Sequence, residues 1–104
     1  MNLCIIKLGA HGDVLRTLPL AKALKDASPS ATITWITRGD IATLLEGLPY
    51  IKRIIQIEDV ADIEDEEFNA LNNFDVDEEA LELVEVLQAK KKYGFHDDGG
   101  YPAA

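Results

Sequence analysis

The apolar residues in the first half of the chain form short continuous runs, separated by stretches with helical spacing. The first run, Leu3–Leu8, is apolar except at Lys7, and a turn with two glycines follows it. A continuous run indicates a strand buried on both faces of a parallel sheet rather than an alternating edge strand. Runs rich in β-branched residues at Ala31–Ile36 and Lys52–Ile57 predict two further strands.

Two helices are predicted between these strands. The first ends near Ala27, and its inward face has a spacing of three and four residues, at Val14, Leu18, Ala21 and Leu24. Pro19 lies inside this pattern, and proline in a helix interior costs roughly 3 kcal/mol. We therefore expect Asp13–Thr17 to form a separate short turn, with Pro19 near the true helix start; a helix bent at Pro19 is the alternative. Asp40 is expected to cap a short second helix that ends at Leu45.

The second half of the chain continues the alternation more weakly. Phe68–Phe74 predicts a fourth strand, and Asp77 is expected to cap a helix over residues 78–89. The inward positions of that helix are Ala80, Leu83, Val84 and Leu87. Lys90–Phe95 is predicted as a basic helix end followed by a short fifth strand, because cations suit the negative end of a helix dipole. Asp97–Gly100 has the composition of a turn.

Strands and helices that alternate at these intervals are typical of βαβ units. The sequence therefore predicts an α/β fold: a Rossmann-like open parallel sheet of about five strands, with helices on both faces. The 104 residues are expected to form a single domain, because a chain of this size cannot hold two lobes with a cleft between them.

Charge and composition narrow the class of partner. A net charge of −9 argues against nucleic acid and against electrostatic docking on an anionic membrane. No apolar run approaches the length of a membrane span and no signal peptide is visible, so a cytoplasmic location is expected. Residues 58–82 contain many acids and no Lys or Arg, which favours a solvated face and a flexible crossover.

Neither a metal nor a cofactor is expected. The acidic stretch lacks the pattern of a calcium-binding loop, and His96 beside two aspartates indicates a turn rather than a metal cluster. The single cysteine, Cys4, is expected to be a buried free thiol in a reducing compartment. Trp35 is expected in the core rather than in a sugar-stacking platform.

The turn after Leu8 is the candidate site. In a parallel sheet this turn lies beyond the carboxyl end of a strand, where open α/β sheets bind ligands. Gly9 and Gly12 permit backbone geometries or close approaches that a side chain would block. Asp13 falls where the helix should begin, so its carboxylate can cap free N–H groups. The N–H groups at Ala10–Gly12 are also placed to bind an anion.

Several segments together carry a family resemblance, and they cover most of the chain. They are Ile6–Leu15, Thr17–Leu20, Ala23–Lys25, Ala31–Ile36, Leu45–Ile51, Ile54–Ile57, Asn73–Asp75, Ala80 and Ala89–Phe95. In this order they resemble glycosyltransferase family 9, the ADP-heptose:lipopolysaccharide heptosyltransferases of bacteria. The combination of Gly-Asp-Val-Leu with Thr-Leu-Pro and the later Lys-Tyr-Gly-Phe makes the resemblance more specific than the first motif alone.

The resemblance implies the N-terminal lobe of an inverting two-lobe enzyme of the GT-B arrangement, which requires no metal. This lobe would mainly hold the lipopolysaccharide acceptor, and a C-terminal lobe, absent from this chain, would bind most of the ADP-heptose donor. Asp13 would be the general base that deprotonates the acceptor hydroxyl. Without the second lobe we expect little or no transferase activity. The complete enzyme is expected in the cytoplasm, with peripheral association at the inner membrane as a further possibility.

The remaining candidates surround Asp13. Lys7 and Arg16 flank the turn and are candidates to bind an acceptor carboxylate or phosphate; pairing of Lys7 with a neighbouring acid is the alternative. His11 is either an exposed loop residue or an acceptor contact, and Ala10 lacks the hydroxyl that the family often has there. The alternative function is a non-enzymatic α/β module that binds a partner or small anion through Gly9–Asp13. A dinucleotide-binding domain is disfavoured, because the three-glycine fingerprint is missing.

Overall fold

The computed structural model describes residues 1–9 and 11–94, and for residues 11–13 and 40 it describes the backbone only. Five parallel strands form one sheet in the order β3-β2-β1-β4-β5, which confirms the Rossmann-like α/β prediction. The elements are β1 (Asn2–Ile6), α1 (His11–Ala27), β2 (Thr32–Thr37), α2 (Gly39–Leu45), β3 (Arg53–Gln56), the 3₁₀ helix η1 (Ile57–Ile63), β4 (Glu67–Asn73), α3 (Glu78–Val86) and β5 (Gln88–Gly94).

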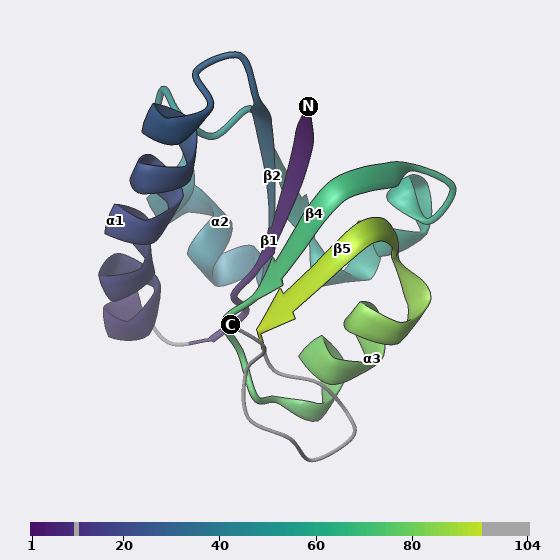
Figure 1. The fold of residues 1–104 in the computed structure, drawn as a ribbon. Coiled ribbons are helices and arrows are strands. Elements are labelled where there is room, and N and C mark those ends of the chain that lie inside the picture. The colour runs from purple at the N-terminus through teal and green to yellow at the C-terminus, as the bar shows by residue number, and fades with distance from the viewer. Residues whose placement is uncertain (10, 95–104) are drawn as a thin grey trace.

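The central strand β1 separates two apolar cores. Leu3 and Ile5 pack with Trp35 of β2 against α1 and α2, whereas Cys4 and Ile6 face α3 and η1. Figure 1 shows α1 and α2 on one side of the sheet and α3 on the other. Because neighbouring side chains of a strand point to opposite faces, a continuous apolar run is what a strand covered on both faces requires.

Helix α1 corrects the prediction of a separate first turn. It runs without a break from His11 to Ala27, with Pro19 inside it. Pro19 cannot donate to the carbonyl of Leu15, but both residues lie on the exposed side, where water can satisfy that carbonyl. The buried residues Val14 and Ala21 hold the helix against the sheet on either side of the proline. Burial of this face therefore outweighs the local cost of proline.

The end of α3 also differs from the prediction. The helix stops at Val86, and the extended backbone of the buried Leu87 leads directly into β5. Residues 90–92 therefore lie in a strand rather than at a basic helix end. This strand pairs only with β4 among the described residues, and lysines are typical of such an edge because they discourage further strand pairing. The predicted inward positions of α3 are buried as expected: Ala80, Leu83, Val84 and Leu87.

Some of the remaining expectations are confirmed and others are not. The acidic stretch is largely exposed, as predicted, but the crossover forms η1, which buries Val60 and Ile63, rather than an irregular segment. Arg38, not Asp40, occupies the position before α2. The expected turn at 97–100 and His96 lie outside the described residues. Within the part of the chain that the structure describes, no helix is both long and apolar enough to cross a membrane.

Among the glycines that the structure describes at 9, 39, 47 and 94, Gly94 is the one whose place in the sheet excludes a side chain on two grounds. Its φ is +95°, a backbone conformation that residues with a side chain rarely adopt. A Cβ on this residue would also collide with the backbone of Asn73, whose carbonyl carbon would lie only 2.9 Å away. The end of β5 can therefore lie against the end of β4 only when residue 94 has no side chain.

We predict that Gly94→Ala lowers the free energy of unfolding by roughly 3 kcal/mol, because backbone strain and a steric collision add. Gly47→Ala is the matched control, because Gly47 has a φ of +83° but no atom within 4 Å of its missing Cβ. Strain alone predicts a loss of about 1 kcal/mol there. Denaturant unfolding of both variants measures the difference, and equal losses would show that the contact with Asn73 has no effect.

Candidate functional site

The predicted site lies at the carboxyl edge of the sheet, where β1 leads into α1. The helix begins at His11, so Asp13 is its third residue and not the residue that precedes it. The prediction that Asp13 occupies the N-cap position is therefore wrong. Asp13 still belongs to the first helical turn, where the helix dipole favours a negative charge. His11 and Gly12 share this turn, and Ala10 lies outside the described residues.

A second aspartate, which the sequence did not single out as a site residue, lies beside this turn. Asp75 follows β4, the strand next to β1, and is 4% exposed. Its Oδ2 accepts hydrogen bonds from the backbone N–H groups of Leu8 at 3.0 Å and Gly9 at 3.2 Å. Its Oδ1 accepts another from the N–H of Asp77 at 3.0 Å. One carboxylate therefore joins the turn after β1 to the turn after β4.

The environment of Asp75 stabilises its ionised form. Burial acts to raise the pKa of the Asp75 carboxyl, but hydrogen bonds from the backbone N–H groups of Asp77, Leu8 and Gly9, together with the charge of Lys7, lower it below its usual value. The ammonium of Lys7 lies 3.8 Å from Oδ2. The buried carboxylate is thus charged, hydrogen-bonded at both oxygens, and close to a cation.

Lys7 points toward this internal partner. Its side chain is 13% exposed, and its Nζ donates a hydrogen bond to the carbonyl of Phe74 at 3.2 Å. This arrangement corresponds to the alternative of pairing with a neighbouring acid. Arg16, the other flanking cation, lies on the second turn of α1 and is exposed. Neither arrangement tests whether these residues contact a ligand, so that remains a prediction.

Arg38 links a third strand end to the same region. It follows β2, and its guanidinium contacts Asp77 at 3.3 Å and Glu79 at 2.7 Å, both beside the start of α3. Asp77 therefore pairs with Arg38 and makes no side-chain capping bond to α3, contrary to the predicted cap. The ends of β1, β2 and β4 are held together by these contacts and by those of Asp75.

Gly9 is less constrained than its place in the motif suggested. Its φ lies outside the left-handed region, and a Cβ added to it would make ordinary contacts at 3.7–3.9 Å with Arg38, Asp75 and Asp77. The expectation that Gly9 is needed for an unusual backbone geometry is therefore not met. The fold itself can accept alanine at this position.

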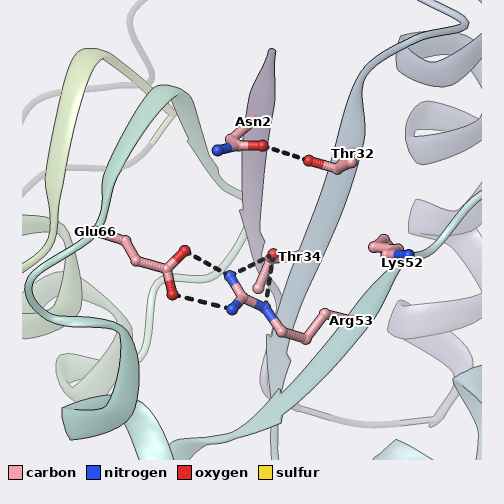
Figure 2. Close-up of a pocket in the computed structure, with 6 residues that line it drawn as sticks. All are labelled: Asn2, Thr32, Thr34, Lys52, Arg53 and Glu66. Carbon is pink, nitrogen blue, oxygen red and sulfur yellow. Dashed lines mark hydrogen bonds and ion pairs between the residues drawn. The ribbon is translucent and has the colours of Figure 1, made fainter.

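A pocket of about 320 Å³ lies at the opposite, amino edge of the sheet. Its lining residues are Asn2, Thr32, Thr34, Lys52, Arg53 and Glu66. Figure 2 shows the Arg53 guanidinium forked onto the Glu66 carboxylate, with two distances of 2.9 Å, and also bonded to the Thr34 hydroxyl. These hydrogen bonds lower the pKa of the Glu66 carboxyl. Because Arg53 and Glu66 neutralise each other, Lys52 gives the pocket lining a net positive charge.

Two further expectations concern reactive groups. Cys4 is fully buried, and burial raises the pKa of its thiol to about 12, as expected of a structural cysteine. Trp35 is also fully buried, and its indole N–H donates to the carbonyl of Lys7 at 3.2 Å. Among residues 1–9 and 11–94, with the four backbone-only positions left aside, no three His, Cys, Asp or Glu side chains converge on a common point.

Comparison with known proteins finds this fold in several solved structures. No family model matches the sequence, and no curated protein matches it significantly. Among solved structures, a glycosyl transferase family 9 protein from Veillonella parvula DSM 2008 matches with a TM-score of 0.77 and 19% identity over 88% of this chain. E. coli heptosyltransferase WaaC with ADP matches at 0.72 and 17% over 90%. E. coli ADP-heptose lps heptosyltransferase II matches at 0.61 and 16% over 70%.

The sequence motifs resemble those of glycosyltransferase family 9, and the shared fold agrees with that resemblance. At identities below 20% they show a shared architecture and not a shared activity. The chain spans only 30%, 35% and 24% of the lengths of these three structures. The five-stranded sheet with its helices thus matches one portion of each of these larger structures.

Asp75 predicts a specific pH dependence of stability. Because its pKa is lower in the folded chain than its ordinary value of 3.8, its contribution is fully present above that value and is lost below it, as pH falls through the lower pKa of the folded chain. We expect Asp75→Asn to lower the free energy of unfolding by about 2 kcal/mol at neutral pH. The gap to the wild type should be constant above about pH 5 and should shrink as pH falls below about 4. Urea unfolding across this range measures it, and a gap independent of pH would contradict an ionised Asp75.

Proposed function

We propose that this chain is the N-terminal, acceptor-side lobe of an inverting glycosyltransferase. The proposed reaction transfers heptose from ADP-heptose to the lipopolysaccharide inner core. The observation that carries the proposal is the position of Asp13, in the first helical turn after the central strand of a sheet that matches glycosyltransferase structures. The Gly-Asp-Val motif and the shared fold support the same assignment from independent directions.

In the proposed mechanism Asp13 is the general base. It takes the proton from an acceptor hydroxyl while that oxygen attacks the anomeric carbon of the heptose, and the nucleoside diphosphate leaves from the opposite side. The base must lie about 2.6–3.2 Å from the hydroxyl oxygen. The start of α1 favours the ionised carboxylate, which is the form that can accept a proton, and for the same reason makes it a weak base. The inverting reaction proposed here needs no metal.

The residues around Asp13 are proposed to bind the acceptor. They are Lys7, Gly9, Ala10, His11, Gly12 and Arg16. A second lobe would supply most of the donor site, so the 104 residues alone are proposed to have little or no activity, because the donor would not be held in line with the acceptor. Val76 and Leu15, 62% and 51% exposed near this edge, are apolar surface of the kind that a docked lobe would cover. The complete enzyme is proposed to act in the cytoplasm, at the surface of the inner membrane.

The alternative, a non-enzymatic module that binds a small anion through Gly9–Asp13, has less support. Free backbone N–H groups at a strand-to-helix turn are what makes such a turn attract anions. Here the N–H groups of Leu8 and Gly9 are already bonded to a carboxylate of the same chain. An anion at Gly9–Asp13 would therefore find the N–H group of Gly9 already bonded and would meet the negative charge of Asp75.

We predict that Asp13→Asn in the native protein lowers the rate of heptose transfer by about 10²–10⁴-fold, because the amide cannot accept the proton. The matched control is Asp26→Asn at the far end of the same helix, where the carboxylate is 65% exposed and pairs with Lys22. The measurement is ADP release with ADP-heptose and a heptose-deficient lipopolysaccharide acceptor. Turnover by the Asp13 variant close to that of the control would remove this residue from the mechanism.

A further inference from the structure

The turn after β1 contains an anion that belongs to the protein. In open α/β folds the N–H groups at such a turn commonly bind a ligand's phosphate or carboxylate. In this chain the N–H groups of Leu8 and Gly9 donate instead to Oδ2 of Asp75, which is 67 and 66 residues away in the sequence. A side-chain carboxylate thus occupies the place that a ligand oxygen would take.

The backbone on both sides fixes this carboxylate. The N–H of Phe74 donates to the carbonyl of Ile6 at 2.9 Å and extends the pairing of β4 with β1. The N–H of Asp75 donates to Oδ1 of Asn73 at 2.9 Å, and the N–H of Asp77 donates to Oδ1 of Asp75. The two oxygens of Asp75 therefore hold the turn before α1 and the turn before α3 at one relative position.

We propose that Asp75 is a positioning residue whose carboxylate acts as a built-in anion. It holds the turn before α1 so that the Asp13 carboxylate can reach the acceptor. It also prevents ligand phosphates from binding at this turn. This inference rests on the proposed function in its reference to Asp13. It goes beyond that function by assigning the turn to a neutral hydroxyl ligand rather than to a phosphate.

The role is one of positioning and not of catalysis. Asp75 is 4% exposed and directs both oxygens at backbone N–H groups, so it does not face a substrate. Its contact with Gly9 is close in sequence to Asp13, which follows in the first turn of α1. Lys7, at 3.8 Å, compensates the buried charge.

The first test replaces the built-in anion with a soluble one in the 104-residue chain. Asp75→Ala leaves a space of carboxylate size beside the N–H groups of Leu8 and Gly9, and sodium formate is the probe. We expect the ¹⁵N–¹H signals of Leu8, Gly9 and residues 11–14 to move in the variant and to return toward their wild-type positions, saturably, as formate is added. Hydrogen exchange at Leu8 and Gly9 should be about tenfold faster in the variant without formate, the factor for loss of one hydrogen bond.

Two controls separate positioning from general stabilisation. Asp77→Ala removes a neighbouring, 47% exposed carboxylate but leaves the contacts of Asp75 with the N–H groups of Leu8 and Gly9, so the signals of these two residues should remain and formate should have no effect. Asp75→Asn fills the same space without the charge, so it should speed exchange but not respond to formate. If Asp75→Ala fails to fold, the Asp75→Asn variant still tests the proposal. Unchanged hydrogen exchange at Leu8 and Gly9 in this variant would overturn it, and so would unmoved signals at residues 11–14.

The second test separates this inference from the proposed function. In the native protein, Asp75→Ala should lower kcat by about a hundredfold, the usual effect of a base misplaced by about 1 Å, while KM for the donor stays within about twofold. Formate should restore part of kcat in this variant and none in Asp13→Asn. Full turnover by Asp13→Asn would overturn the general base without affecting the formate titration. Unmoved signals at residues 11–14 in Asp75→Ala would overturn the positioning role even if Asp13 is essential.

Discussion

The buried carboxylate of Asp75 is the interaction on which the candidate site depends. Parallel pairing aligns β1 with β4 but leaves the turns beyond their carboxyl ends without a shared partner. Asp75 joins them, because it accepts from the N–H groups of Leu8 and Gly9 on one side and of Asp77 on the other. The lowered pKa of its carboxyl shows that these bonds outweigh the effect of burial. The first turn of α1, with Asp13, is built onto this fixed point.

The two edges of the sheet differ in how their polar groups are paired. At the amino edge the pocket is open, but Arg53 and Glu66 satisfy each other across it. At the carboxyl edge, contacts from Asp75 and Arg38 hold three strand ends together, and α1 begins directly beyond them. Asp13, rather than the pocket, is the proposed centre of function, because it belongs to the Gly-Asp-Val motif and lies in the first helical turn at the carboxyl edge.

Local pattern was enough to predict the sheet, because β1 and β2 are buried on both faces and their apolar runs show it. It failed where tertiary packing overrides local preference, at Pro19 inside α1 and at the lysines of β5. Asp75 and Arg38 could not be found as site residues, because their partners are distant in sequence and become neighbours only when β4 lies beside β1. Gly94, part of the family motif, acquires its physical reason only from the adjacent backbone of Asn73.

The most direct test of this account is a crystal structure of the native protein with ADP and a lipopolysaccharide inner-core acceptor. The account predicts an acceptor hydroxyl within about 3 Å of the Asp13 carboxylate, at hydrogen-bond distance. It also predicts that no ligand phosphate contacts the N–H groups of Leu8 and Gly9, which remain bonded to Asp75. An acceptor bound at the amino-edge pocket, or a phosphate seated on those two N–H groups, would contradict it.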